Sequence, residues 1–239
     1  MRILEGEKVT KHFGGLAAVH QVDFDINQGE VVGLIGPNGA GKTTLFNLIS
    51  GSLPTTAGEI RYKGKKITGL KSHQICKKGV ARTFQSAKLF AGLTVLENVL
   101  AASLFGTKRT ISVPDAEKEA IELLEFVELS TVGAMLAKDL PIASRKRLEV
   151  ARALATKPDL LLCDEVMAGL NPADVAQAME LITKIRNKGI TIFMIEHVMK
   201  AIMNICDRII VLHHGSKIAE GTPEKIATSR TVIEVYLGE

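Results

Sequence analysis

The sequence predicts an α/β protein with a parallel β-sheet, a flanking antiparallel β-layer and an inserted helical subdomain. Three patterns predict this fold class. Runs of aliphatic residues alternate with helical patterns, which is typical of parallel strands covered by helices on both faces. Strands near the N-terminus are instead joined by short polar turns, which indicates antiparallel pairing. Between residues 86 and 149 no strand pattern stands out, and helical patterns take its place.

The antiparallel layer is expected from three strand-like segments near the N-terminus. They cover residues 3–12, 18–26 and 58–64. Polar turns such as Gly14-Gly15 and Asn27-Gln28-Gly29 separate them, because these residue types favour tight reversals of the chain. This layer is expected to flank the first strand of the parallel sheet.

The parallel sheet is expected to begin with the apolar run from residue 31 to residue 35. Its other aliphatic strands are predicted at residues 79–84, 159–165, 189–196 and 208–213. Helical patterns lie between the later strands, at residues 172–187 and 198–204. This alternation places helices on both faces of one sheet.

The helical subdomain is expected from three segments, at residues 94–105, 115–127 and 144–156. The last of these carries Leu148, Ala151 and Ala155 on one face. At 239 residues the chain has room for one domain with a small lobe. We therefore expect a single domain in which residues 1–85 and 150–239 form the core and residues 86–149 form the inserted lobe.

Residues 36–43, with the sequence GPNGAGKT, match the phosphate-binding pattern G-x-x-x-x-G-K-S/T. The match lies between an apolar strand and a helical pattern, as the chemistry requires. Glycines allow successive N–H groups to converge on phosphate oxygens, and the following helix adds partial positive charge. The lysine is expected to reach the β- and γ-phosphates, and a threonine hydroxyl to bind Mg²⁺. The predicted binding residues are Gly36, Pro37, Asn38, Gly39, Ala40, Gly41, Lys42, Thr43 and Thr44, with Thr43 preferred as metal ligand.

Two carboxylates, Asp164 and Glu165, end the apolar strand LLLC at residues 160–163. A buried strand needs a reason to end in paired acids, and ligand sites collect beyond the carboxyl ends of parallel strands. Asp164 is expected to hold Mg²⁺ through water. Glu165 points elsewhere and is expected to polarise the water that attacks the γ-phosphate.

Composition excludes several classes of protein. Charged residues make up 23% and hydrophobic residues 46%, as in ordinary soluble domains. No apolar run approaches the ~18 residues that span a bilayer, and the N-terminus becomes acidic before a signal sequence forms, so we expect a cytoplasmic protein. Cys76, Cys163 and Cys206 are odd in number and far apart, which indicates no disulfide framework.

A basic region follows the phosphate-binding helix and contains Lys63, Lys65, Lys66, Lys71, Lys77 and Lys78. A nucleic-acid groove and a solvated basic face are both compatible with it. Aromatic residues are only 4% of the chain, and the region matches no nucleic-acid-binding motif. We expect no nucleic-acid partner.

The chain resembles the ATP-binding subunits of ABC transporters almost from end to end. The resemblance rests on the order of the phosphate-binding loop, the segment ARTFQSAKLFAGLTVLENVL at 81–100, the paired acids, AGLNP at 168–172 and EHVMKAIMNICDRIIVLHHG at 196–215. Together with HFGGLAAV at 12–19 and the ending EGTPEKI…VYLGE, these segments are similar to those of branched-chain amino acid importers. The resemblance implies a P-loop NTPase core of the ABC type, with ATP and Mg²⁺ as its cofactors.

The resemblance also implies roles for further residues. Gln85 would sense the γ-phosphate and Mg²⁺ and would relay their presence to the helical lobe. His197 corresponds to the switch histidine that contacts the γ-phosphate, and Phe13 to the aromatic residue that stacks on adenine, with His12 as an alternative. Asn171 corresponds to a loop that crosses a dimer interface.

The chain departs from the family at the signature motif LSGGQ. The aligned segment is Leu140-Pro141-Ile142-Ala143-Ser144, followed by three cations at 145–147. In the family this motif touches ATP held by the opposite subunit, and losing one hydroxyl bond to a phosphate costs about 1.5–3 kcal/mol. Ser144 is expected to cap the helix and to offer a substitute hydroxyl. These cations oppose the dipole of the helix that they begin. Either a bound anion relieves this conflict, or the cations point into water.

The resemblance implies a subunit that binds and hydrolyses ATP to energise an importer of branched-chain or other hydrophobic amino acids. Its implied partners are a second cassette, in a homodimer or heterodimer, integral membrane permease subunits and, indirectly, an extracytoplasmic solute-binding protein. The implied location is the cytoplasmic face of the plasma membrane. Importers of urea or amides, a soluble ABC ATPase without a transport role and a non-hydrolysing ATP-gated subunit are the alternatives.

Overall fold

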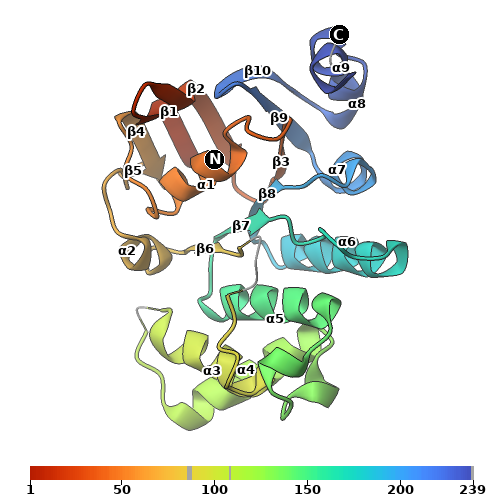
Figure 1. Ribbon diagram of the computed structural model, residues 1–239. Coiled ribbons are helices and arrows are strands. Elements are labelled where there is room, and N and C mark those ends of the chain that lie inside the picture. Colours follow the sequence, from red (N-terminus) through yellow and green to blue (C-terminus); the bar gives the residue numbers. More distant parts are fainter. Residues whose placement is uncertain (85–87, 108, 238–239) are drawn as a thin grey trace.

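The computed structural model describes residues 1–84, 88–107 and 109–237, which form two β-sheets and a helical lobe (Figure 1). The antiparallel sheet has the order β2-β1-β4-β5. Its strands are β1 (Arg2–Phe13), β2 (Leu16–Asn27), β4 (Ala57–Tyr62) and β5 (Lys65–Lys66). The strand expected at 58–64 ends at Tyr62, because Lys63 and Gly64 adopt positive φ angles of 50° and 70° and turn the chain into β5.

The second sheet has the order β10-β9-β3-β8-β7-β6. Neighbouring strands are parallel except for the edge strand β10, which is antiparallel to β9. Its strands are β3 (Val31–Ile35), β6 (Val80–Arg82), β7 (Leu160–Asp164), β8 (Thr191–Ile195), β9 (Arg208–His213) and β10 (Ser216–Gly221). The predicted α/β class with a parallel sheet is confirmed. Strand β10 was not predicted, because its sequence SKIAEG is short and largely polar.

The helices follow the strands in the expected alternation and add short elements that the sequence did not reveal. The helices that match predicted segments are α1 (Lys42–Ile49), α3 (Val95–Phe105), α4 (Val113–Phe126), α5 (Ile142–Ala155), α6 (Pro172–Asn187) and α7 (Met199–Ile205). The unpredicted ones are α2 (Ser72–Cys76), α8 (Pro223–Ala227), α9 (Arg230–Leu237) and the 3-10 turns Ser130–Val132 and Ala137–Asp139.

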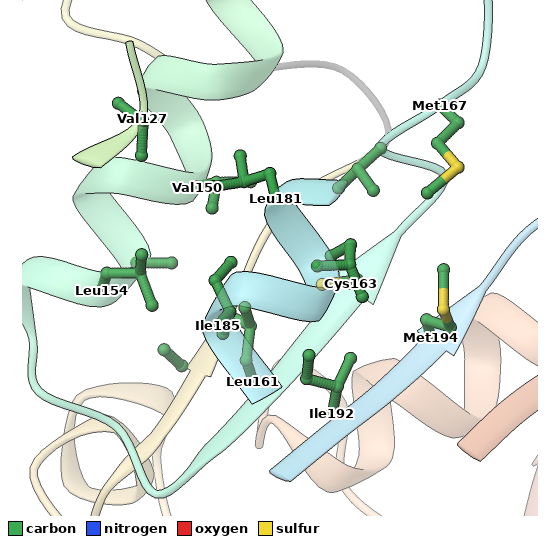
Figure 2. Packing of buried hydrophobic residues seen from close by; sticks show 14 of the residues in the cluster. Val127, Val150, Leu154, Leu161, Cys163, Met167, Leu181, Ile185, Ile192 and Met194 are labelled. Carbon is green, nitrogen blue, oxygen red and sulfur yellow. The ribbon is translucent and has the colours of Figure 1, made fainter. Parts of the chain in front are cut away.

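Two hydrophobic cores hold the strands that carry the site in place. One lies between the antiparallel sheet, α1 and one face of the parallel sheet, and contains the tilted ring pair Phe46 and Phe193 at 5.0 Å. The other lies between the opposite face of the parallel sheet and the helices, where Leu161, Ile192 and Leu181 pack together (Figure 2). Burial on both faces explains the uninterrupted aliphatic character of β7 and β8.

The helical lobe contains α3, α4 and α5, which gather below the sheets in Figure 1. Thr94 and Glu97 form a reciprocal capping box at the start of α3, and Ser112 caps α4. Helix α5 is continuous across residue 150, where the sequence placed the boundary of the lobe, so it connects the lobe to the core. Among the described residues, no helix combines the length and apolar character needed to cross a membrane.

Candidate active site

The phosphate-binding loop connects β3 to α1, as predicted. Gly36, Gly39 and Gly41 have positive φ angles of 150°, 81° and 101°. A Cβ atom on Gly36 would lie 2.1 Å from the Leu212 carbonyl oxygen, and one on Gly41 would lie 2.3 Å from the Ala18 carbonyl oxygen. The loop is therefore pressed against the backbones of β9 and β2. A Cβ atom on Gly39 would meet nothing within 4 Å, so this glycine leaves room for a ligand to approach the backbone.

Lys42 lies at the first position of α1 with only 6% of its surface exposed. Its Nζ donates hydrogen bonds to the carbonyl oxygens of Gly36 at 2.7 Å and Pro37 at 3.0 Å. Burial lowers the pKa of Lys42, and the nearby carboxylates of Glu165 and Asp164 oppose that shift. The ammonium group is thus held inside the loop and facing the paired acids.

The remaining loop residues differ in what they present. Asn38 and Thr43 are exposed, Pro37 and Thr44 are half-buried, and Ala40 is buried. The hydroxyl of Thr43 is therefore accessible at the start of α1, which fits its predicted metal-binding role better than the less accessible Thr44.

Asp164 ends β7 with 1% of its surface exposed. Its Oδ2 forms an ion pair with Arg82 Nη2 at 2.7 Å, and its N–H donates to Thr83 Oγ1 at 3.0 Å. Its Oδ1 is buried and has no partner among the described residues. An orphaned buried carboxylate oxygen is costly unless a cation or water satisfies it, and Mg²⁺ prefers oxygen ligands. The donor set of Asp164 and Thr43 therefore fits a magnesium ion.

Glu165 and His197 come together at the ends of the neighbouring strands β7 and β8. His197 Nε2 lies 3.1 Å from Glu165 Oε1. An ionised carboxylate only accepts hydrogen bonds, so Nε2 carries the hydrogen in this contact. The His197 side chain is 44% exposed and that of Glu165 only 11% exposed. The pair thus reaches from a buried carboxylate to the surface of the site.

Glu165 has the left-handed φ angle of 52°, which costs a residue with a side chain about 1–2 kcal/mol. Its N–H donates to the Ile195 carbonyl oxygen at 2.9 Å. Its own carbonyl oxygen accepts from Lys146 Nζ at 2.9 Å. These contacts hold the strained backbone in place.

Arg82 is a site residue whose role the sequence did not predict. It donates to Asn47 Oδ1 at 2.6 Å and Ser50 Oγ at 3.0 Å, besides pairing with Asp164. Its guanidinium therefore ties α1 to the end of β7 behind the metal-binding carboxylate. The available signal was a cation at the end of an apolar strand, but its partners become neighbours only in the folded chain.

The segment that replaces the signature motif differs from expectation in two ways. Helix α5 begins at Ile142 after Pro141, so Ser144 lies within the first turn, and the prediction that it caps the helix is wrong. The cations at 145–147 also do not simply point into water. Arg145 donates to the Lys138 carbonyl oxygen, Lys146 to that of Glu165, and Arg147 to Glu128 and Gln177.

Phe13 ends β1 with 48% of its surface exposed, so it is not the core residue that a phenylalanine at a strand end usually is. Lys11 Nζ lies 5.1 Å from its ring centroid. Asn171 caps α6 by accepting the N–H groups of Ala173 and Asp174, both at 2.9 Å. Gln85 lies outside the described residues.

The C-terminal helix makes a further contact that the sequence did not predict. The backbone N–H of Gly36 forms a hydrogen bond with the hydroxyl of Tyr236 on α9. Burial raises the pKa of Tyr236, and this hydrogen bond opposes the shift. Helix α9 therefore touches the first glycine of the phosphate-binding loop.

Comparison with known proteins identifies the family in which this arrangement of residues occurs. A family model described as ABC transporter matches residues 19–168, and one described as branched-chain amino acid ATP-binding cassette transporter matches residues 216–239. The chain is 42% identical to the high-affinity branched-chain amino acid transport ATP-binding protein BraF of Pseudomonas aeruginosa, covering 99% of this chain and 98% of that protein.

Two solved structures extend the comparison to three dimensions. The ADP conformation of MJ1267, an ATP-binding cassette of an ABC transporter, is 33% identical with a TM-score of 0.90 and full coverage of both chains. The dimeric structure of MJ0796, a bacterial ABC transporter cassette, is 28% identical with a TM-score of 0.85, covering 92% of this chain and 99% of that one. The chain therefore belongs to the ABC transporter family, as an ATP-binding cassette.

Proposed function

We propose that this chain binds and hydrolyses ATP to drive an importer of branched-chain amino acids. One observation carries the ATPase proposal. Lys42, Asp164 and the Glu165–His197 pair come from three segments that are far apart in sequence, yet all lie at the carboxyl ends of adjacent parallel strands. This is the edge at which open α/β sheets bind ligands.

The chain's own residues bind and orient the nucleotide. Backbone N–H groups of residues 39–43 and the Lys42 ammonium receive the phosphates, because Gly39 leaves their approach open. The exposed Phe13 ring stacks on adenine. Thr43 and Asp164 would hold Mg²⁺, with Gln85 as the further ligand that the resemblance implies, and the ion would supply positive charge to the phosphates.

Glu165 acts on the water that attacks the γ-phosphate. Its carboxylate accepts the hydrogen bond from His197 and, in the proposed reaction, accepts a hydrogen bond from the attacking water as its general base. His197, exposed on the outer side of this carboxylate, contacts the γ-phosphate. Full hydrolysis therefore requires both side chains in one arrangement.

A second cassette completes the site. The start of α5 exposes Ile142 at 60% of its surface, next to Ser144, which suits a segment that meets another protein. In the proposed dimer, residues 140–147 of each subunit face the ATP held by the other, and Ser144 contributes its hydroxyl from the first turn of α5.

A groove between α2, β6 and the helical lobe receives the permease. It encloses a volume of about 270 Å³ and is lined by residues that include Arg82, Phe84, Lys88, Glu149 and Arg152. It borders both the core, through β6, and the lobe, through α5. A permease segment seated there would sense movement of one relative to the other.

The transported solute is assigned from similarity. BraF carries a name that specifies branched-chain amino acids, and residues 216–239 match a family model whose description names the same amino acids. The test is transport by the native complex purified through this chain and reconstituted in proteoliposomes with its solute-binding protein. Uptake of leucine, isoleucine or valine that needs ATP supports the assignment, whereas uptake of urea or amides alone contradicts it.

A further inference from the structure

Glu196 is a buried carboxylate that the proposed mechanism leaves without a role. It directly follows β8, and only 2% of its surface is exposed. Its Oε1 accepts the backbone N–H of Met167 at 2.8 Å, and the backbone N–H of His197 also donates to the carboxylate. Its Oε2 is buried and has no partner within the described part of the chain. Burying a carboxylate this deeply costs free energy of folding, which indicates that Glu196 has a function.

The two donors belong to the segments that carry the catalytic pair. Met167 lies two residues after Glu165 on the loop that follows β7, and His197 lies on the loop that follows β8. The bond from Glu165 N–H to the Ile195 carbonyl oxygen joins the two segments at their start. The Glu196 side chain joins them a second time, beyond the end of the strand ladder.

The strained backbone of Glu165 explains why a second link is needed. A left-handed residue relaxes unless its surroundings hold it, and such strain is characteristic of functional sites. Contacts at 2.9 Å hold its N–H and its carbonyl oxygen, and the N–H of Ala168 closes the following turn by donating to the same carbonyl oxygen at 3.2 Å, but none of these bonds engages the N–H of Met167 within that turn. The bond from Met167 N–H to Glu196 fixes that next turn.

We infer that Glu196 is a positioning residue for ATP hydrolysis, which holds the loop behind Glu165 so that the Glu165 carboxylate stays against His197. The inference rests on the proposed roles of Glu165 and His197. This role requires a side chain at position 196 that is long enough to place an acceptor oxygen beside the N–H of Met167. Its loss is expected to lower the rate of turnover without weakening nucleotide binding.

The test compares three substitutions in the full chain with Mg·ATP. Glu196→Asp withdraws the carboxylate by one methylene, Glu196→Met keeps the length but removes the acceptor, and Glu196→Gln keeps an acceptor oxygen. The Asp and Met variants are expected to lose at least about tenfold in kcat with KM for ATP within about threefold, because a displaced catalytic group lowers turnover without weakening phosphate binding. The Gln variant is expected to stay within about threefold of the parent in both constants.

Thr191→Val provides a matched control at the opposite end of β8. Thr191 is fully buried, and its Oγ1 accepts the N–H of the half-buried Gly29 at 3.0 Å, so this variant also deprives a backbone N–H of its acceptor. It is expected to lower the Tm while leaving kcat within about twofold, since it lies away from the site. Hydrogen exchange at the Met167 amide gives a direct readout and should quicken in the Asp and Met variants alone.

Two outcomes would overturn the inference. One is a kcat in Glu196→Asp or Glu196→Met that falls no further than in Thr191→Val. The other is a Gln variant as impaired as the Met variant, which would mean that the acceptor oxygen is not what matters. Failure of the ATPase mechanism is distinguishable, because it shows as full turnover by Glu165→Gln, with Glu196 unchanged.

Discussion

Glu165 joins a buried carboxylate, a left-handed backbone and a contact with His197 in a single residue. Its neighbour Asp164 faces a different set of groups, Arg82 and Thr83, although it is only one residue away. Strand β7 ends at Asp164 and the chain turns at the left-handed Glu165, so the two adjacent acids acquire separate partners. One is placed to bind metal and the other to act on water.

Replacing Glu165 with glutamine is expected to slow ATP hydrolysis by roughly 10²–10⁴ while ATP still binds, because the amide retains the shape but removes the basic oxygen. Phosphate release and nucleotide binding measured on the same preparation check the two halves. Turnover at the parent rate would remove Glu165 from its assigned role.

Glu196 makes stability depend on pH. Burial, and next the nearby Glu165 charge, raise its pKa from 4.5 to about 7 against the effect of the Met167 and His197 N–H groups and Lys146. The folded state therefore binds this proton more tightly than the unfolded state does. Below about pH 4.5 the carboxyl group is protonated in both states and does not lower the free energy of unfolding, whereas between about pH 4.5 and pH 7 its ionisation lowers that free energy increasingly.

Glu196→Gln removes this titration. Relative to the parent, the variant should gain about 1–3 kcal/mol in free energy of unfolding at pH 8 compared with pH 4.5. Urea unfolding of both proteins at the two pH values measures it. A difference that does not change with pH would contradict the expectation.

At the scale of elements, the phosphate-binding loop has a rigid end and an open end. Gly36 is packed against β9 and Tyr236, whereas Gly39 faces free space. The loop therefore needs its packed end at Gly36 to stay in place as much as it needs the conformational freedom of its glycines.

Gly36→Ala and Gly39→Ala separate steric clash from backbone strain. Gly39→Ala should cost about 1–2 kcal/mol through its positive φ alone. Gly36→Ala should cost clearly more, because its Cβ would lie 2.1 Å from a backbone oxygen that cannot swing away. Thermal unfolding of both variants without nucleotide measures the two losses of stability. Equal losses would show that the backbone around Gly36 moves to accommodate the added methyl group.

The sequence predicted the elements whose cause is local. Strands β7 and β8 could be predicted because both of their faces are buried, which makes their sequences uniformly apolar. The phosphate-binding loop could be predicted because its glycines and lysine have a fixed spacing. The capping role of Ser144 was wrong because Pro141 ends the preceding turn and lets α5 start two residues before the serine. The hydrogen-bond partners of Arg82 and the contact between Glu196 and Met167 were beyond prediction, since the former lie 32 or more residues from Arg82 along the chain and Met167 lies 29 residues from Glu196.

For the whole molecule, each nucleotide site is expected to be completed by another cassette. ATP with Mg²⁺ should therefore convert Glu165→Gln from monomer to dimer, because bound nucleotide joins the loop of one subunit to residues 140–147 of the other and the slowed variant retains it. Sedimentation with ATP, with ADP and without nucleotide checks this. Lys42→Ala is the control and should remain monomeric in all three, and a variant that stays monomeric in ATP would argue against a shared site.

The order of strands in the parallel sheet has a consequence for biosynthesis. Strand β3, made early, has β8 and β9 as its neighbours, and these are translated more than 150 residues later. The ribosome must therefore release most of the polypeptide before the phosphate-binding loop gains its supporting strands. A nascent chain stopped before β8 should not be retained on an ATP resin, so nucleotide capture would report that translation has proceeded beyond β8.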